Sequence, residues 1–116
     1  MTIRKTLIAL GLAAVLPAAA HAEVDAAAMQ ALATKHLCLA CHKIDGKLVG
    51  PSYKEVAAKY KGDATAAAKL FERVKKGGGK NVWGSAAVMP PAGPPNAPPT
   101  DAQLKSLIEW VLSQAK

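Results

Sequence analysis

The sequence is poor in aromatic side chains, which limits the core that the chain can build. Only five of its 116 residues are aromatic, namely Tyr53, Tyr60, Phe71, Trp83 and Trp110. Chains near this size with so few large side chains often depend on disulfides, metals or another added group for stability. We therefore expect one small domain that something beyond its own side chains completes.

The sequence also lacks an apolar run long enough to span a bilayer. The segment from Leu7 to Leu16 is too short for this. It follows Arg4 and Lys5 and precedes Ala20-His21-Ala22, a pattern typical of a secretory signal rather than an N-terminal membrane anchor. We expect residues 1–22 to be a cleaved signal peptide and residues 23–116 to form the domain, located in the periplasm without stable membrane insertion.

A strong excess of one charge is absent as well. Without residues 1–22 the chain has 13 basic and 8 acidic residues, a net charge of +5. Nucleic acid is not an expected partner outside the cytoplasm. The modest positive charge either only keeps the protein soluble or complements an acidic patch on a partner protein. We expect a monomer.

No segment shows the period-two alternation of a strand, so we expect an all-α domain of three to five helices. We expect helices over residues 24–42 and 53–60. A third helix would be capped by Asp63 and ended by Gly77–Gly79, and a fourth would begin at the capping box Thr100/Gln103. The segment 43–52 is an expected loop. The segment 89–99 holds six of the eight prolines and cannot be a helix interior.

Apolar residues at helical spacing predict which helix faces are buried. For the first helix these are Met29, Leu32, Ala33, His36, Leu37 and Ala40. For the third they are Ala67, Leu70, Phe71 and Val74, and for the last Leu104, Leu107, Ile108, Val111 and Leu112.

The most specific motif joins the only two cysteines to a histidine. Cys38 and Cys41 are separated by two residues, and His42 follows directly. On a helix, positions three apart share one face. This spacing is the attachment signal of c-type haem, in which two thioether bonds hold the porphyrin and the adjacent imidazole is the proximal iron ligand. Export agrees with this reading, because such attachment takes place outside the cytoplasm.

Three other interpretations of the thiols compete with haem. A redox-active disulfide of the thioredoxin type needs a βαβ setting, and no strands are expected. A closed zinc site needs four ligands, whereas residues 23–116 hold one cysteine pair and only His36 and His42. A structural disulfide would leave His42 without a role. We therefore favour one covalently bound haem c.

A second axial ligand would close the iron to small molecules, and three residues are candidates. His36 precedes His42 by six residues on the expected first helix and should not reach the opposite side. Met29 lies on the apolar stripe of that helix, where methionine usually fills the core. Met89 stands at the start of the stiff proline tract, far along the chain from Cys41. We favour Met89, although it could also only fill a gap in the core.

Three segments together resemble a known family. "CLACHKIDGKLVGPSYKEVAAKY", "ERVKKGGGKNVWGSAAVMPP" and "AQLKSLIEWVLSQAK" are similar to the small bacterial class I cytochromes c, the subgroup that donates electrons to nitrite reductases and terminal oxidases. The similarity covers nearly all of residues 23–116. It implies thioether bonds at Cys38 and Cys41 and axial ligation by His42 and Met89.

The resemblance also implies three supporting residues. The carbonyl of Pro51 would accept a hydrogen bond from the His42 ring, the Trp83 indole would donate to a haem propionate, and Arg73 would lie near the same propionate. The chain departs from the family pattern at Ala33, where an aromatic residue is usual, and its tract after "MPP" is longer and richer in proline.

The expected function is one-electron transfer between respiratory donors and terminal reductases or oxidases, with no substrate turnover. Redox proteins would be transient partners. The alternative is a haem-based sensor or catalytic haem protein in which Met89 is displaceable.

Overall fold

The computed structural model describes residues 11, 25–78, 83–84 and 87–115. The expected signal segment lies outside these residues except for Gly11. Its cleavage and the boundary at residue 23 therefore stay expectations.

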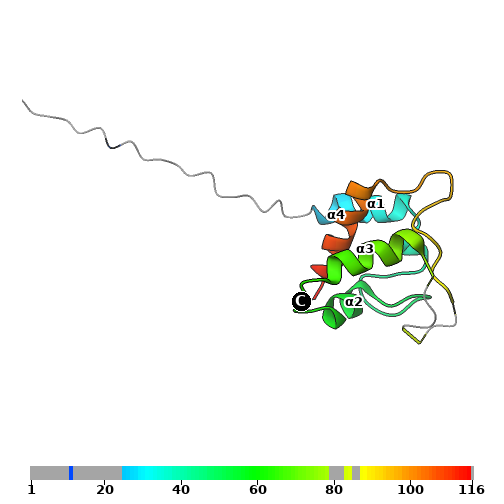
Figure 1. Cartoon of the computed structure of the whole chain (residues 1–116), viewed down its shortest axis with the longest axis horizontal. Coiled ribbons are helices and arrows are strands. Elements are labelled where there is room, and N and C mark those ends of the chain that lie inside the picture. Colours follow the sequence, from blue (N-terminus) through cyan, green and yellow to red (C-terminus); the bar gives the residue numbers. More distant parts are fainter. Residues whose placement is uncertain (1–10, 12–24, 79–82, 85–86, 116) are drawn as a thin grey trace, which may run out of the picture.

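The described residues form four α-helices and one 3-10 turn. They are α1 (Ala26–Lys35), the 3-10 turn η1 (Cys38–Ala40), α2 (Tyr53–Lys59), α3 (Ala66–Lys76) and α4 (Asp101–Leu112). The residues that the structure describes contain no strand, which confirms the expected all-α class. Helix α4 contacts each of the other three helices. Residues 87–100, which lead into α4, run along one side of the domain (Figure 1).

The core consists of two clusters, and α4 contributes to both. On one side Leu107 and Trp110 pack with Ala33 of α1 and Tyr53 of α2. On the other side the buried residues are Val56 of α2, Leu70 of α3, and Leu104 and Ile108 of α4. Trp110 is only 2% exposed, although the periodicity of the last helix did not place it on the buried face. The indole extends that face further than the apolar stripe predicts.

Local signals explain where α2 and α4 begin. The Ser52 hydroxyl accepts from the Glu55 N–H at 3.1 Å, and the Glu55 carboxylate accepts from the Ser52 N–H at 3.0 Å. Thr100 and Gln103 form the same reciprocal pair before α4, as predicted. Each pair satisfies two backbone donors that a helix start leaves without partners.

The first helix is shorter than the sequence predicts, and this is a correction. It ends at Lys35, because Leu37 adopts the left-handed conformation with φ of 64°. Leu37 and Ala40 are exposed rather than buried, whereas Ala33 and His36 are buried. Side-chain periodicity continues unbroken through this segment, so it carries no signal for the backbone turn.

The start of α3 is a second correction. Asp63 does not cap it; Thr65 holds the N-cap position without a side-chain hydrogen bond to the helix. The Asp63 carboxylate instead accepts from the N–H and hydroxyl of Thr65 at 2.8 and 2.6 Å, and so closes the preceding turn. At the start of the helix Ala66 is buried and Ala67 exposed, one residue off the predicted stripe.

Candidate functional site

A largely apolar pocket lies between the helices and two loop segments, residues 49–51 and 87–90. Its walls include side chains from α2, α3 and α4, and the described residues that line it also include every site residue expected from the sequence. These are Cys38, Cys41, His42, Pro51, Arg73, Trp83 and Met89. The apolar walls are formed by Val49, Val56, Leu70, Val74, Val88, Leu107, Ile108 and Val111. Folding thus brings together residues as far apart in the chain as Cys38 and Val111.

The cysteine segment is a tight turn rather than a continuation of α1. The His42 N–H donates to the Cys38 carbonyl at 3.0 Å, and the Cys41 N–H approaches the same oxygen at 3.3 Å. Cys38, Cys41 and His42 are all half-buried. The prediction that an α-helix would place the two thiols on one face is wrong in its geometry, but the 3-10 turn brings both cysteines to the pocket.

The loop after His42 closes back onto its ring. His42 Nδ1 lies 2.8 Å from the carbonyl oxygen of buried Pro51, a distance at which the ring N–H donates to that oxygen. The Gly50 N–H donates to the Cys41 carbonyl at 2.7 Å. A Cβ at Gly50 would lie 2.8 Å from His42 Nδ1, so a side chain there would displace the imidazole. A donated Nδ1–H leaves Nε2 unprotonated and available as a metal ligand.

Met89 is held by the end of α3. Its carbonyl accepts from the Gly78 N–H at 2.7 Å, and the Ala92 N–H donates to the Val74 carbonyl at 3.0 Å. These two bonds bracket Pro90 and Pro91, whose rings restrict the backbone further. The chain is therefore fixed at Met89 and again three residues later, and Met89 is half-buried and lines the pocket.

Trp83 and Arg73 line the same pocket, and both are half-buried. The ammonium of Lys59, at the end of α2, lies 4.7 Å from the centre of the Trp83 ring. Arg73 comes from the last turn of α3. An indole N–H and a guanidinium are both hydrogen-bond donors, so they suit a carboxylate group of a bound molecule.

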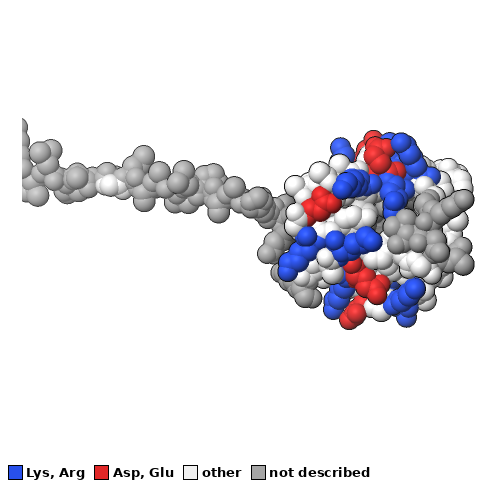
Figure 2. All heavy atoms as spheres, turned by 60° about the horizontal axis from the view of Figure 1, so that its bottom comes forward, with Lys and Arg blue, Asp and Glu red and all other residues white. Residues whose placement is uncertain are grey.

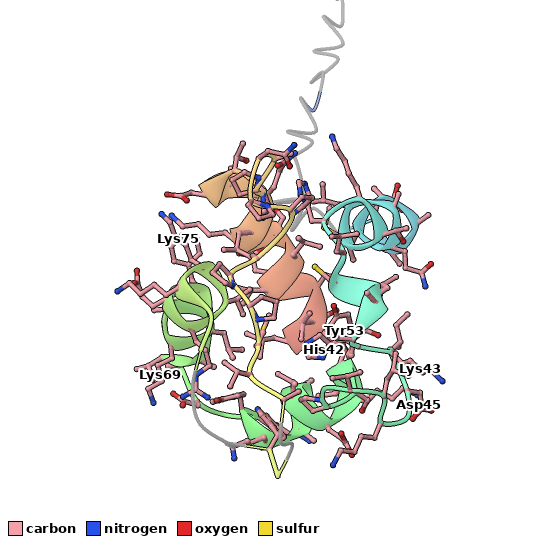
Figure 3. The ribbon with its side chains drawn as sticks, turned by 90° about the vertical axis from the view of Figure 1, so that its right-hand side faces the viewer. His42, Lys43, Asp45, Tyr53, Lys69 and Lys75 are labelled. Carbon is pink, nitrogen blue, oxygen red and sulfur yellow. The ribbon has the colours of Figure 1, made fainter. Side chains whose placement is uncertain are left out.

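Sequence reasoning missed Tyr53 as a site residue. It also lines the pocket, is 6% exposed, and stacks on His42 with ring centroids 5.4 Å apart and planes at 21° (Figure 3). Its position as the first residue of α2, two residues after Pro51, is a signal that could have been used. Burial, together with the adjacent Cys38 thiol, raises the pKa of Tyr53, so the phenol is neutral at physiological pH.

The thiol chemistry of the site argues against disulfide exchange. As a free thiol, Cys38 has a raised pKa, chiefly because burial disfavours the thiolate. Reactive exchange cysteines usually have a lowered pKa. The described residues also contain no strand that could supply a βαβ setting and no group of three His, Cys, Asp or Glu side chains that could hold a metal ion. The interpretation as a zinc site therefore has no support here.

The other candidate ligands lie elsewhere. His36 is 4% exposed and is not among the residues that line the pocket. It was expected to share a helix with His42, which is wrong because α1 ends at Lys35. Met29 packs against the cluster of Ala33, Tyr53, Leu107 and Trp110, as expected for a core methionine. Of the three candidates, Met89 alone lines the pocket.

The donor set fits a covalently attached haem. Two cysteines, an imidazole and a thioether line one pocket, and most of the other residues that line it are apolar. The chain offers hydrogen-bond donors at Trp83 and Arg73 for the carboxylates of such a group.

Comparison with known proteins agrees with this fit. The family model described as cytochrome c matches residues 26–115. Cytochrome c-551 of Pseudomonas aeruginosa is 51% identical over 77 residues, which cover 66% of this chain and 67% of the relative. Cytochrome c-552 of Nitrosomonas europaea is 40% identical over 101 residues, covering 87% and 88%. The crystal structure of wild-type cytochrome c552 from Nitrosomonas europaea superimposes with a TM-score of 0.63 at 40% identity, covering 73% of this chain and 98% of that one.

Proposed function

The chain belongs to the cytochrome c family and is a monohaem electron carrier, not an enzyme, and from this we propose that it works in the periplasm, passing single electrons between respiratory donors and terminal reductases or oxidases. The observation that carries the proposal is the meeting of Cys38, Cys41, His42 and Met89 at one apolar pocket. A haem with nitrogen and sulfur ligands supplies reversible one-electron chemistry without a change of ligands.

We assign a role to each residue of the chain at this pocket. Cys38 and Cys41 bind the porphyrin through thioethers, and His42 and Met89 ligate the iron. Pro51 orients the imidazole through the 2.8 Å contact of its carbonyl oxygen with Nδ1 and makes the ring a better electron donor. The apolar walls lower the local dielectric, which disfavours the extra positive charge of ferric iron and raises the reduction potential.

Trp83 and Arg73 bind the haem propionates in this proposal. Both residues line the pocket, and the Lys59 ammonium lies 4.7 Å from the centre of the Trp83 ring, which supports a role for hydrogen-bond donors and positive charge near the carboxylates. Without such partners a buried carboxylate would be strongly destabilised.

The mouth of the pocket offers a contact surface for redox partners. Val49 and Val88 line the pocket yet are 46% and 63% exposed, so they reach both the interior and the solvent. The exposed lysines Lys35, Lys43 and Lys47 belong to the same stretch of chain that surrounds the cysteine motif. From the sequence, Lys80 is a further candidate for this surface, but it lies outside the described residues. A small apolar surface with a basic surround suits brief encounters with acidic partners.

On the face shown in Figure 2, Lys and Arg are interspersed with Asp and Glu. Ion pairs among the described residues include Lys54–Asp45 at 3.2 Å and Lys75–Asp101 at 2.9 Å. Within the part of the chain that the structure describes, no helix is long and apolar enough to cross a membrane.

The ligand assignment is tested by Met89→Ala, with Met29→Ala as the matched control. Met89→Ala should lower the reduction potential, remove the sulfur-to-iron charge-transfer band of the ferric protein, and open the iron to carbon monoxide. Met29→Ala removes a methionine from the core and should change stability alone. If the wild-type protein already bound carbon monoxide readily and were high-spin, the sensor or catalytic alternative with a displaceable Met89 would replace the carrier.

The location is tested on the exported protein itself. Mass analysis of the periplasmic fraction should find a chain that begins at Glu23 and carries one haem. A chain that retains residues 1–22 in the membrane fraction would contradict the proposed signal peptide.

A further inference from the structure

Three aromatic rings run in sequence from the pocket into the core. The His42 imidazole stacks on Tyr53, and the Tyr53 ring meets Trp110 edge-on, with centroids 5.4 Å apart and planes at 75°. His42 and Tyr53 lie side by side in the inner part of the view in Figure 3, whereas Lys69 and Lys75 lie at its edge. The arrangement connects the imidazole to the most deeply buried part of the fold.

Tyr53 is itself held from several sides. Its ring belongs to the buried cluster with Ala33, Leu107 and Trp110, and its backbone N–H donates to the Lys43 carbonyl at 2.9 Å. The capping box of Ser52 and Glu55 anchors the first turn of the helix that carries it. A ring with neighbours on this many sides has little freedom to tilt, so it can serve as a rigid surface for the group that it faces.

The remaining contacts of His42 do not fix the plane of its ring. The hydrogen bond to Pro51 holds one atom, Nδ1. Gly50 lies against the ring at Nδ1 and Cε1, where a Cβ would collide. The covalent bond to Cβ and the hydrogen bond at Nδ1 restrict the ring, but they still allow it to tilt. The stacked face of Tyr53 limits this tilt, because a tilt towards the phenol ring would bring the two faces into collision.

We propose that Tyr53 is a positioning residue for His42, and that its ring sets the plane of the axial imidazole. The proposal rests on the assignment of His42 as an iron ligand in the proposed function. The orientation of an axial imidazole governs its electronic overlap with the metal, and partners that orient a ligating histidine influence affinity and activity about 10–100-fold. A ring that stays in one plane also has less to rearrange when the electron moves.

The experiment compares holoprotein variants that separate the ring of Tyr53 from its hydroxyl. Tyr53→Phe retains the stack and loses the hydroxyl, whereas Tyr53→Leu loses the stack. Tyr60→Leu is the matched control, because Tyr60 ends the same helix and packs on the opposite cluster without lining the pocket. The readouts are the spread of the haem methyl shifts in the ferric NMR spectrum, the reduction potential and the electron self-exchange rate.

Tyr53→Leu should change the methyl-shift spread and slow self-exchange about 10-fold, the low end of the range above. Tyr53→Phe should restore the wild-type values, and Tyr60→Leu should lower the unfolding temperature without moving the spectrum. An unchanged spectrum in Tyr53→Leu, the same change in Tyr60→Leu, or an equal change in Tyr53→Phe would each overturn the positioning role.

Gly50→Ala tests the same geometry if Tyr53→Leu does not yield holoprotein. The added Cβ would push the imidazole out of its present plane, so the methyl-shift spread should change here too. An unmoved spectrum would mean that the ring plane is not set by these contacts. Failure of the proposed function would show differently, as a wild-type ferric protein without a low-spin signal.

Discussion

The substitution Gly77→Ala should detach Met89 from its position, although Gly77 has no side chain that could contact Met89. Gly77 ends α3 with φ of 67° and ψ of −171°. This backbone region is almost restricted to glycine and costs about 1–3 kcal/mol for other residues. A Cβ at this residue would also lie 2.6 Å from the carbonyl carbon of Pro90 and 2.8 Å from Pro91 Cδ.

Those neighbours cannot move aside at low cost. Pro90 and Pro91 have fixed φ angles, and the bonds from Gly78 to Met89 and from Ala92 to Val74 hold the segment at both ends. The chain therefore relieves the collision by moving the segment that carries Met89. If about 2 kcal/mol of strain is released when the segment detaches, its detached form gains about 30-fold in population, since each 1.4 kcal/mol is a factor of ten.

The assay is the sulfur-to-iron charge-transfer band of the ferric protein together with carbon monoxide binding. Gly62→Ala is the control, because Gly62 also has a positive φ, of 79°, but nothing lies within 4 Å of an added Cβ. Gly62→Ala should cost about 1 kcal/mol and lower the unfolding temperature by about 4–8 °C with the band intact. Gly77→Ala should weaken the band and admit carbon monoxide. An intact band in both variants would refute the reasoning.

Three further predictions concern stability and partners. His36→Leu should raise the midpoint of denaturant unfolding by an amount equivalent to about 1–3 kcal/mol, because neither ring nitrogen of this buried residue has a hydrogen-bond partner among the described residues; a lower midpoint would contradict this. Hydrogen bonds from Thr65 and Lys69 lower the pKa of Asp63 from 3.8 to about 2, so its contribution to stability is complete above pH 4 and is lost as the pH falls towards 2. Thermal unfolding of the wild type should therefore lose more stability across that window than that of Asp63→Asn, and parallel curves would count against it. Electron transfer to an acidic partner should slow as ionic strength rises, and a flat dependence would count against the basic surround of the pocket.

The expected helices differ in how well local signals define them. The capping box at Thr100 predicts the start of α4, which the structure confirms, because a cap is a contact between residues three apart and needs nothing from the rest of the fold. The start of α2 at Tyr53 is also as expected, and the structure adds a capping box at Ser52 that the sequence analysis did not use. The end of α3 at Gly77 is confirmed, because glycine adopts positive φ at little cost. The end of α1 at Lys35 was missed, because Leu37, a residue type that gives no signal for a helix end, adopts the left-handed conformation there.

In the candidate site, too, some features have a local signal in the sequence and others do not. The spacing of Cys38, Cys41 and His42 identifies the chemistry, because two thiols and an imidazole on adjacent turns suit few cofactors. The stacking of Tyr53 on that imidazole joins residues eleven positions apart and has no local signature. Nor does the closeness of Gly77 to Pro90 and Pro91, which depends on how the loop returns over α3.

The sequence by itself determined the helical class, the starts of α2 and α4, and which residue types are available to bind a haem, because these depend on covalent spacing and contacts within one turn. Only the tertiary structure decided that Met89 rather than His36 lines the pocket and that Tyr53 faces His42. The physical reason is that burial and packing involve segments far apart in the chain, and their free energy depends on the whole core rather than on any one stretch of residues.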